Sequence, residues 1–191
     1  YMKFAVANQF FTIAHQAGVD YGNVLDAIRR DYPRAADLPG PGFAAGPCLF
    51  KDTMQLAAFT SDHFPLGQSA MQVNEGLPAY IVAALERRYG GLADKKIGVL
   101  GMAFKAGTDD LRESPIVTLI EMLIGKGMDV AVFDHDVSSA NVIGSNREYI
   151  EKEIPHIWTL VDDSMERVVA RSDVIVIGNG TPAFRDIGQQ L

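Results

Sequence analysis

The sequence has a single cysteine, no long basic run and no long apolar segment, and each of these shortages excludes a class of protein. One cysteine cannot form an internal disulfide, and it also excludes a zinc site of the multi-cysteine type. The net charge of −7, without any basic cluster, argues against binding to a nucleic-acid backbone. Apolar stretches such as 97–104 and 174–177 are far shorter than the roughly 20 residues that a membrane helix needs. We therefore expect no nucleic-acid partner and no membrane partner, with the cytoplasm as the default compartment.

The chain opens inside an apolar pattern that already has helical spacing. Phe4, Ala7, Phe11 and Ala14 recur at this spacing, and no capping residue precedes them. We therefore expect the sequence to be a fragment of a longer protein, starting within a helix.

Residues up to about Arg88 read as helical. A first helix runs to about Gln16, Asp20 can cap a second, and another extends from about 49 to 60. Between them lies a loop rich in Gly and Pro, residues 38–47, which neither a helix nor a strand tolerates.

A further apolar pattern extends from about Gly67 to Tyr89 and contains Pro78. Because proline lacks an amide hydrogen, it either kinks this helix or splits it. If continuous, the helix is long enough to form a rod between domains or in a dimer.

The periodicity changes after Lys96, so we place a domain boundary between residues 92 and 93. Short apolar runs now alternate with helical patterns, and this alternation predicts parallel βαβ units in a doubly wound sheet. We therefore expect an α/β chain with a helical region over 1–92 and a sheet domain over 93–191. The predicted strands are 96–101, 129–134 and 173–178, and the predicted helices between them are 115–125 and 164–170.

Cys48 is the first candidate site residue. A buried cysteine is normally a small core hydrophobe, but this one follows the glycine loop and begins a helix, where the helix dipole favours a thiolate. Lys51 and Asp52 lie three and four positions further on, which is the same helix face. This spacing predicts a cation and a carboxylate beside the sulfur.

The second candidate site is the polar loop that follows the first predicted strand. Ser114 and Pro115 fit the N-cap and the first position of a helix, and the acids between 109 and 113 suit the same helix end. Capping does not explain Lys105 and Arg112, which the pattern places at the carboxyl edge of a parallel sheet, where such folds bind ligands.

Several other features favour ordinary structural roles. Gly98 and Gly101 give only Gly-x-x-Gly rather than the full dinucleotide fingerprint, although Asp134 ends the second strand as a ribose-binding acid does. Asn74 and Glu75 could face a partner helix, but a solvated helix face is the default expectation. The histidines have no metal-ligand spacing, so we predict no metal site: His15, His63, His135 and His156.

Two runs carry a resemblance to a known family. The run from Gly42 through Cys48 to Asp52 resembles the cysteine motif of the UDP-glucose and GDP-mannose dehydrogenases, a Gly-Phe-Gly-Gly-Ser-Cys core followed two residues later by Lys-Asp. Here Ala44-Ala45-Gly46-Pro47 replaces the glycine pair and adds one residue. The run Phe104 to Pro115 is similar to a motif in the third domain of the same family, which is Rossmann-like. These resemblances identify the chain as the central and C-terminal domains of such a dehydrogenase.

The resemblance implies oxidation of a sugar C6 alcohol to a carboxylate with two NAD⁺ in succession. It implies Cys48 as the nucleophile of a thiohemiacetal and thioester, Asp52 as the residue that positions water, and Lys51 as a charge-balancing cation. It also implies a homodimer through the long central helix, an NAD domain outside this sequence, and a catalytic Lys-x-x-x-Asn pair upstream of Tyr1. The substrate-binding residues that it implies are Gly42, Phe43, Arg34, Phe104 and Lys105, and the residue that would reach NAD is Arg112.

Three alternatives stay open on the sequence alone. We put a UDP-sugar first as the substrate, either UDP-glucose or a UDP-N-acetylhexosamine, without a residue that decides it, and GDP-mannose stays open. The chain is part of an enzyme, or it is a catalytically silent module that binds a nucleotide-sugar and dimerises. A third reading, in which residues from Lys96 onward form a true NAD domain, is disfavoured because the glycine fingerprint is absent.

Overall fold

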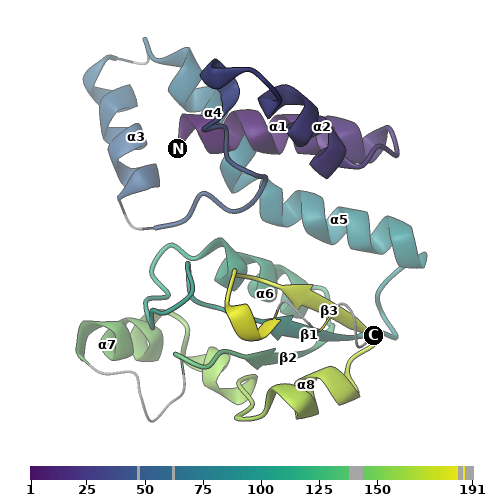
Figure 1. Ribbon diagram of the computed structural model, residues 1–191. Helices are drawn as coiled ribbons and strands as arrows, with labels where there is room; N and C mark the ends of the chain where they lie inside the picture. The colour runs from purple at the N-terminus through teal and green to yellow at the C-terminus, as the bar shows by residue number, and fades with distance from the viewer. Residues whose placement is uncertain (47, 62, 138–143, 185–186, 188–191) are drawn as a thin grey trace. The chain divides into compact units, whose positions relative to one another are not determined.

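A computed structural model describes residues 1–46, 48–61, 63–137, 144–184 and 187. The chain divides into two compact units, Tyr1–Leu77 and Pro78–Leu191 (Figure 1). This division lies before the domain boundary expected after residue 92, which stays a prediction. Within the second unit, Lys126 Nζ donates to Glu86 Oε1 at 2.8 Å.

The first unit is helical. Helix α1 packs against α2 and α4, and α3 packs against α4 (Figure 1). Asp20 caps α2 as expected, because its Oδ1 accepts a hydrogen bond from the Gly22 amide at 2.8 Å. The elements are α1 Met2–Gln16, α2 Tyr21–Arg29, the 3₁₀ turn η1 Pro33–Ala35, α3 Leu49–Phe59 and α4 Pro65–Glu75.

The long helix expected over 67–89 is two helices. Helix α4 ends at Glu75 with Gly76 as its C-cap, and α5 spans Leu77–Tyr89. Pro78 explains the break, because it supplies no amide hydrogen to a continuous helical ladder. The single rod on which the dimer expectation depended is therefore replaced by two shorter helices.

The second unit is a parallel α/β structure, as the alternating pattern predicted. Its three strands have the order β2-β1-β3, and β1 pairs in parallel with both neighbours. The elements after α5 are β1 Lys96–Leu100, α6 Pro115–Gly125, β2 Asp129–Phe133, α7 Gly144–Glu153, η2 Pro155–Thr159, α8 Met165–Arg171, β3 Val174–Ile177 and η3 Pro182–Phe184.

Strand β1 is central, and helices cover both faces of the sheet. The chain moves from β1 to β2 in one direction and reaches β3 on the other side of β1, so right-handed crossovers place α6 and α8 on opposite faces (Figure 1). Accordingly, every β1 residue after Lys96 is buried. The reversal of strand order puts a topological switch point at the carboxyl ends of β1 and β3, the edge at which open α/β sheets bind ligands.

Two glycines meet at this switch point. Gly101 follows β1 with φ +87°, and a Cβ there would lie 2.6 Å from the side chain of Asn179. Gly178 follows β3, and its amide donates to the Leu100 carbonyl at 2.8 Å. No L side chain fits at position 101 without displacing Asn179.

No helix within the described ranges combines the length and the apolar character needed to span a membrane.

Candidate functional site

Cys48 lies at the N-cap position of α3 and is exposed. Its carbonyl oxygen accepts the first hydrogen bond of the helix, from the Asp52 amide at 2.8 Å. Two residues earlier Gly46 has φ +120°, a conformation that glycine adopts readily and other residues rarely. The expectation of a glycine loop that leads into a helix at Cys48 is therefore confirmed.

Lys51 and Asp52 lie in the first turn of α3, one helical turn beyond Cys48. Lys51 Nζ and Asp52 Oδ1 are 3.8 Å apart, and the two side chains are 56% and 67% exposed. The two side chains thus form an ion pair with each other. Both lie one helical turn from Cys48, and their roles toward its sulfur stay a prediction.

A buried asparagine that was not predicted as a site residue, Asn8, holds the glycine loop, and a second buried asparagine bonds Asn8. Asn8 is fully buried on α1, its Nδ2 donates to the Gly42 carbonyl at 2.9 Å, and its Oδ1 accepts from the Gly42 amide at 2.8 Å. Its Nδ2 also donates to Asn74 Oδ1 at 3.0 Å. The amide of Asn8 therefore fixes the loop segment that precedes Phe43 and Cys48.

Asn74 faces a partner helix, α1, which was the alternative to the default of a solvated face. It is 2% exposed, and it pairs with Asn8 and donates to the Tyr1 carbonyl at 3.3 Å. For Asn8 a signal was present in the sequence, because it shares the helical stripe of Phe4 and Phe11. A polar residue in such a stripe indicates a core amide with partners of its own.

The other predicted substrate-binding residues of the first unit lie on different elements. Gly42 and Phe43 are half-buried in the loop, whereas Arg34 is exposed in η1. Lys3, to which we assign no catalytic role, pairs with Asp37 on the surface. The structure thus places Phe43 in the loop that Asn8 holds, and it records no bond that ties Arg34 to that loop among the described residues.

In the second unit, Phe104 and Lys105 lie in the loop that follows β1. Phe104 is half-buried and Lys105 is exposed, with its Nζ 5.5 Å from the centre of the Phe104 ring. This distance is typical of a cation–π contact. A cation is therefore presented at the carboxyl edge of the sheet, where the sequence predicted it.

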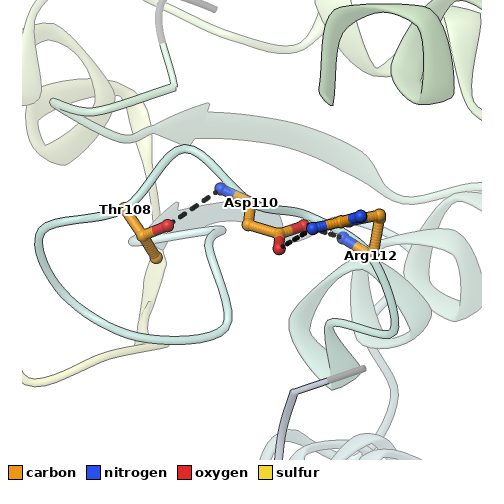
Figure 2. A network of polar contacts seen from close by, with 3 residues as sticks. All are labelled: Thr108, Asp110 and Arg112. Carbon is orange, nitrogen blue, oxygen red and sulfur yellow. Dashed lines mark hydrogen bonds and ion pairs between the residues drawn. The ribbon is translucent and has the colours of Figure 1, made fainter. Parts of the chain in front are cut away.

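Arg112 is clamped by the neighbouring Asp110 (Figure 2). Its Nε donates to Asp110 Oδ1 at 2.8 Å and its Nη2 donates to Asp110 Oδ2 at 2.7 Å. The Arg112 amide also donates to Asp110 Oδ1 at 3.0 Å, and Thr108 Oγ1 accepts from the Asp110 amide at 3.3 Å. These hydrogen bonds from Arg112 lower the pKa of the Asp110 carboxyl below its ordinary value, against the opposing effect of burial. The guanidinium expected to reach NAD is thus held in a fixed orientation by its own loop.

Ser114 precedes α6 but does not cap it with its side chain. Pro115 is the first residue of α6, as predicted, and Ser114 is the N-cap residue. The Ser114 hydroxyl instead donates to the Met102 carbonyl at 2.8 Å. The expected capping hydrogen bond is therefore replaced by one that ties the helix start to the loop after β1.

Asp134 also has a different place from that of a ribose-binding acid. The residue is 5% exposed, and its Oδ2 accepts from the amides of Met102 at 2.6 Å and Ala103 at 3.0 Å. Its Oδ1 accepts from the Asp136 amide at 2.9 Å. Both carboxylate oxygens therefore bind the backbone of the chain itself.

Across the described part of the chain, no group of three or more His, Cys, Asp or Glu side chains could hold a metal ion.

The fold and the sites together define a class: a helical unit with a cysteine loop, followed by a parallel α/β unit of the nucleotide-binding type. Comparison with known proteins gives the family. The sequence model described as "UDP-glucose/GDP-mannose dehydrogenase family, central domain" matches residues 1–76, and that of the UDP-binding domain of the same family matches residues 98–191. The chain belongs to the UDP-glucose/GDP-mannose dehydrogenase family. The first match ends within one residue of the first structural unit.

Individual relatives agree with this assignment. The GDP-mannose 6-dehydrogenase of Pseudomonas aeruginosa is 41% identical over 194 residues, covering 97% of this chain and 43% of the relative. The UDP-N-acetyl-D-mannosamine dehydrogenase of Pyrococcus horikoshii is 32% identical and covers 97% of this chain and 40% of the relative. The chain thus spans less than half the length of these relatives.

Solved structures show the same fold. A crystal structure of a ternary complex of the Pseudomonas aeruginosa GDP-mannose dehydrogenase superposes with a TM-score of 0.69 at 41% identity, over 97% of this chain and 43% of that one. A UDP-glucose dehydrogenase from Pyrobaculum islandicum superposes with a TM-score of 0.77 at 27% identity, over 96% of this chain and 41% of that one.

Proposed function

We propose that the chain supplies the nucleophile and the nucleotide-sugar site of an NAD-dependent nucleotide-sugar 6-dehydrogenase. The observation that carries the proposal is the placement of Cys48, at the start of α3 behind a loop held by the buried amide of Asn8. A helix N-terminus stabilises negative charge, and a fixed loop keeps the sulfur in one place.

Cys48 forms and breaks one covalent bond in the proposed reaction. Its thiolate Sγ adds to the C6 carbon of the aldehyde-level sugar, and the former carbonyl oxygen takes a proton to give a thiohemiacetal. After oxidation to the thioester, water adds to C6 and the C–S bond breaks, which releases the carboxylate and the thiol. Asp52 would orient that water, and Lys51 would balance the charge on the sulfur.

NAD⁺, when bound, supplies the hydride acceptor for both oxidation stages. The loop after β1 does not fit it as a dinucleotide site, because the Met102 and Ala103 amides already bind Asp134. We therefore assign NAD⁺ chiefly to a part of the relatives' length that this chain does not span, and we keep Arg112 as a residue that contacts it. In this role the Asp110 clamp would orient the guanidinium.

The substrate that we put first is now GDP-mannose, in place of the UDP-sugar preferred on the sequence alone. Six relatives at 38% to 41% identity are named GDP-mannose 6-dehydrogenase, whereas the UDP-N-acetyl-D-mannosamine dehydrogenase is 32% identical. Lys105 would offset the charge of the diphosphate, which every candidate substrate shares.

Thermal unfolding with a panel of nucleotide-sugars tests the binding half of the proposal. GDP-mannose, UDP-glucose and UDP-N-acetylmannosamine are each added at increasing concentration, and at least one should raise Tm because a ligand of the folded state stabilises it. Lys105→Ala should reduce this rise, while Lys95→Ala, a matched change before β1, should keep it. Absence of a rise with all three ligands would contradict the proposal.

A second experiment tests the role of Cys48. A nucleotide-sugar 6-aldehyde labelled with ¹³C at C6 is mixed with the chain, and the ¹³C spectrum should show a thiohemiacetal carbon. Cys48→Ser, which replaces one atom, should remove that signal. If the chain were a catalytically silent binding module, the ligand would raise its Tm but no thiohemiacetal signal would appear.

A further inference from the structure

Two aspartates that follow β2 hold the loop that follows β1. The buried Asp134 carboxylate binds the amides at the start of that loop, those of Met102 and Ala103. Asp136 Oδ2 accepts from the Gly107 amide at 3.0 Å, in the middle of the same loop. The Phe104–Lys105 segment is therefore flanked on both sides by residues whose amides are held by side chains about thirty positions away in the sequence.

A further hydrogen bond joins this loop to the start of α6. The Ser114 hydroxyl, itself buried, donates to the Met102 carbonyl, while the Met102 amide donates to Asp134. Both polar groups of the Met102 backbone are thus used, so this residue near the start of the loop has little freedom to rotate. Phe104 and Lys105 follow after Ala103.

The Asp134 carboxylate occupies amides that could otherwise bind a ligand. In parallel α/β folds, the backbone amides after the first strand commonly receive phosphate oxygens. Here their acceptor is a carboxylate of the chain, and a second anion beside it would be repelled. We therefore expect a phosphate group at this edge to be bound by side-chain cations. The loop presents Lys105 and Arg112, and Arg112 is already paired with Asp110.

We propose that Asp134, assisted by Asp136, is a positioning residue that orients the Phe104–Lys105 segment for the diphosphate of a nucleotide-sugar. This inference rests on the proposed function and adds a residue outside the two motifs that carry the family resemblance. Asp134 acts through the loop and does not touch the ligand.

The carboxylate chemistry of Asp134 can be separated from its size. Asp134→Ala leaves the amides of Met102 and Ala103 without an acceptor. Asp134→Asn keeps one carbonyl oxygen for them but places an amide group where the second oxygen accepted from Asp136. Loop orientation should therefore be lost in the first variant and partly rescued in the second.

Asp173 provides a matched control. Its Oδ2 accepts from the Lys96 amide at 2.9 Å, which is the same kind of carboxylate–backbone bond at the opposite, amino-terminal edge of the sheet. Because Asp173 is exposed, Asp173→Asn should cost less stability than the changes at Asp134, and it should not change the loop after β1.

The experiment uses the 191-residue chain and isothermal titration with GDP-mannose and UDP-glucose, at a temperature where circular dichroism shows every variant folded. The ligand that binds the wild type should bind Asp134→Ala more weakly by about tenfold or more, with Asp134→Asn between them and Asp173→Asn unchanged. Brief trypsin treatment without ligand should cut after Lys105 fastest in Asp134→Ala, more slowly in Asp134→Asn, and slowest in the wild type and Asp173→Asn.

The outcomes separate the two proposals. If the wild type binds neither these ligands nor UDP-N-acetylmannosamine, the proposed function fails and this inference fails with it. If the wild type binds but Asp134→Ala binds equally well, only the inference is overturned. Equal losses in Asp134→Ala and Asp173→Asn would also overturn it, because they would indicate general destabilisation instead of loop positioning.

Discussion

Replacing Asn8 with alanine should destabilise the first unit more than any surface change of the same kind. The side chain is fully buried and makes three hydrogen bonds, two with the Gly42 backbone and one with Asn74. Alanine makes none of them and leaves the Gly42 amide and carbonyl without the Asn8 partner.

The magnitude follows from the number of groups that lose a partner. A typical hydrogen bond contributes roughly 0.5 to 1.5 kcal/mol, and a buried polar group left unsatisfied costs about 1 to 3 kcal/mol. Water that enters the space satisfies part of this demand, so we expect Asn8→Ala to lower the free energy of unfolding by about 2 to 4 kcal/mol. A typical domain has about 5 to 15 kcal/mol, so the variant should still fold.

Urea unfolding followed by far-ultraviolet circular dichroism measures this loss, with Asn23→Ala as the matched control. Asn23 is exposed on α2, and its side-chain Nδ2 donates to the exposed Asp20 carboxylate at 3.1 Å. That variant should remain within about 0.5 kcal/mol of the wild type. If Asn8→Ala were equally mild, the buried amide would not hold the glycine loop as argued.

Two further predictions concern the second unit. Hydrogen bonds from Arg112 lower the pKa of Asp110, so this pair stabilises the fold at pH values above the ordinary carboxyl pKa of 3.8. The stabilisation is lost as the pH falls through the lower pKa of the folded state. Acid unfolding of Asp110→Asn should therefore depend less on pH than that of the wild type. Gly101→Ala should cost about 2 to 4 kcal/mol in urea unfolding, because φ +87° is unfavourable for alanine and its Cβ would lie 2.6 Å from Asn179. The equivalent change at Gly125, where nothing lies within 4 Å of an added Cβ, should be far milder.

Local chemistry was sufficient to predict most of the elements. Helix α6 begins at Pro115 and ends at Gly125, as the apolar pattern after Ser114 indicated. Each of the three strands matches a predicted apolar run to within one residue at either end. These segments could be predicted because neighbouring residues decide them: an apolar stripe, a proline at N1 and a run of β-branched side chains.

The partners of the polar side chains could not be predicted in the same way. Ser114 fits an N-cap by sequence, yet its hydroxyl bonds Met102, twelve positions away. Asp134 fits a ribose-binding acid, yet it binds the loop after β1. A side chain with several acceptable partners takes the one that the tertiary fold brings nearest, and neither spacing nor propensity contains that information.

The contrast between exposed and buried polar groups explains how the two site-bearing loops keep their positions. Lys51 and Asp52 are more than half exposed, so their ion pair is solvated and adds little to stability. Asn8 and Asp134 are buried, and each bonds the backbone of a loop that carries candidate site residues. Since leaving a buried amide unpaired costs more than breaking a solvated ion pair, the buried residues hold the loops, and the exposed Lys51, Asp52 and Lys105 are available for chemistry.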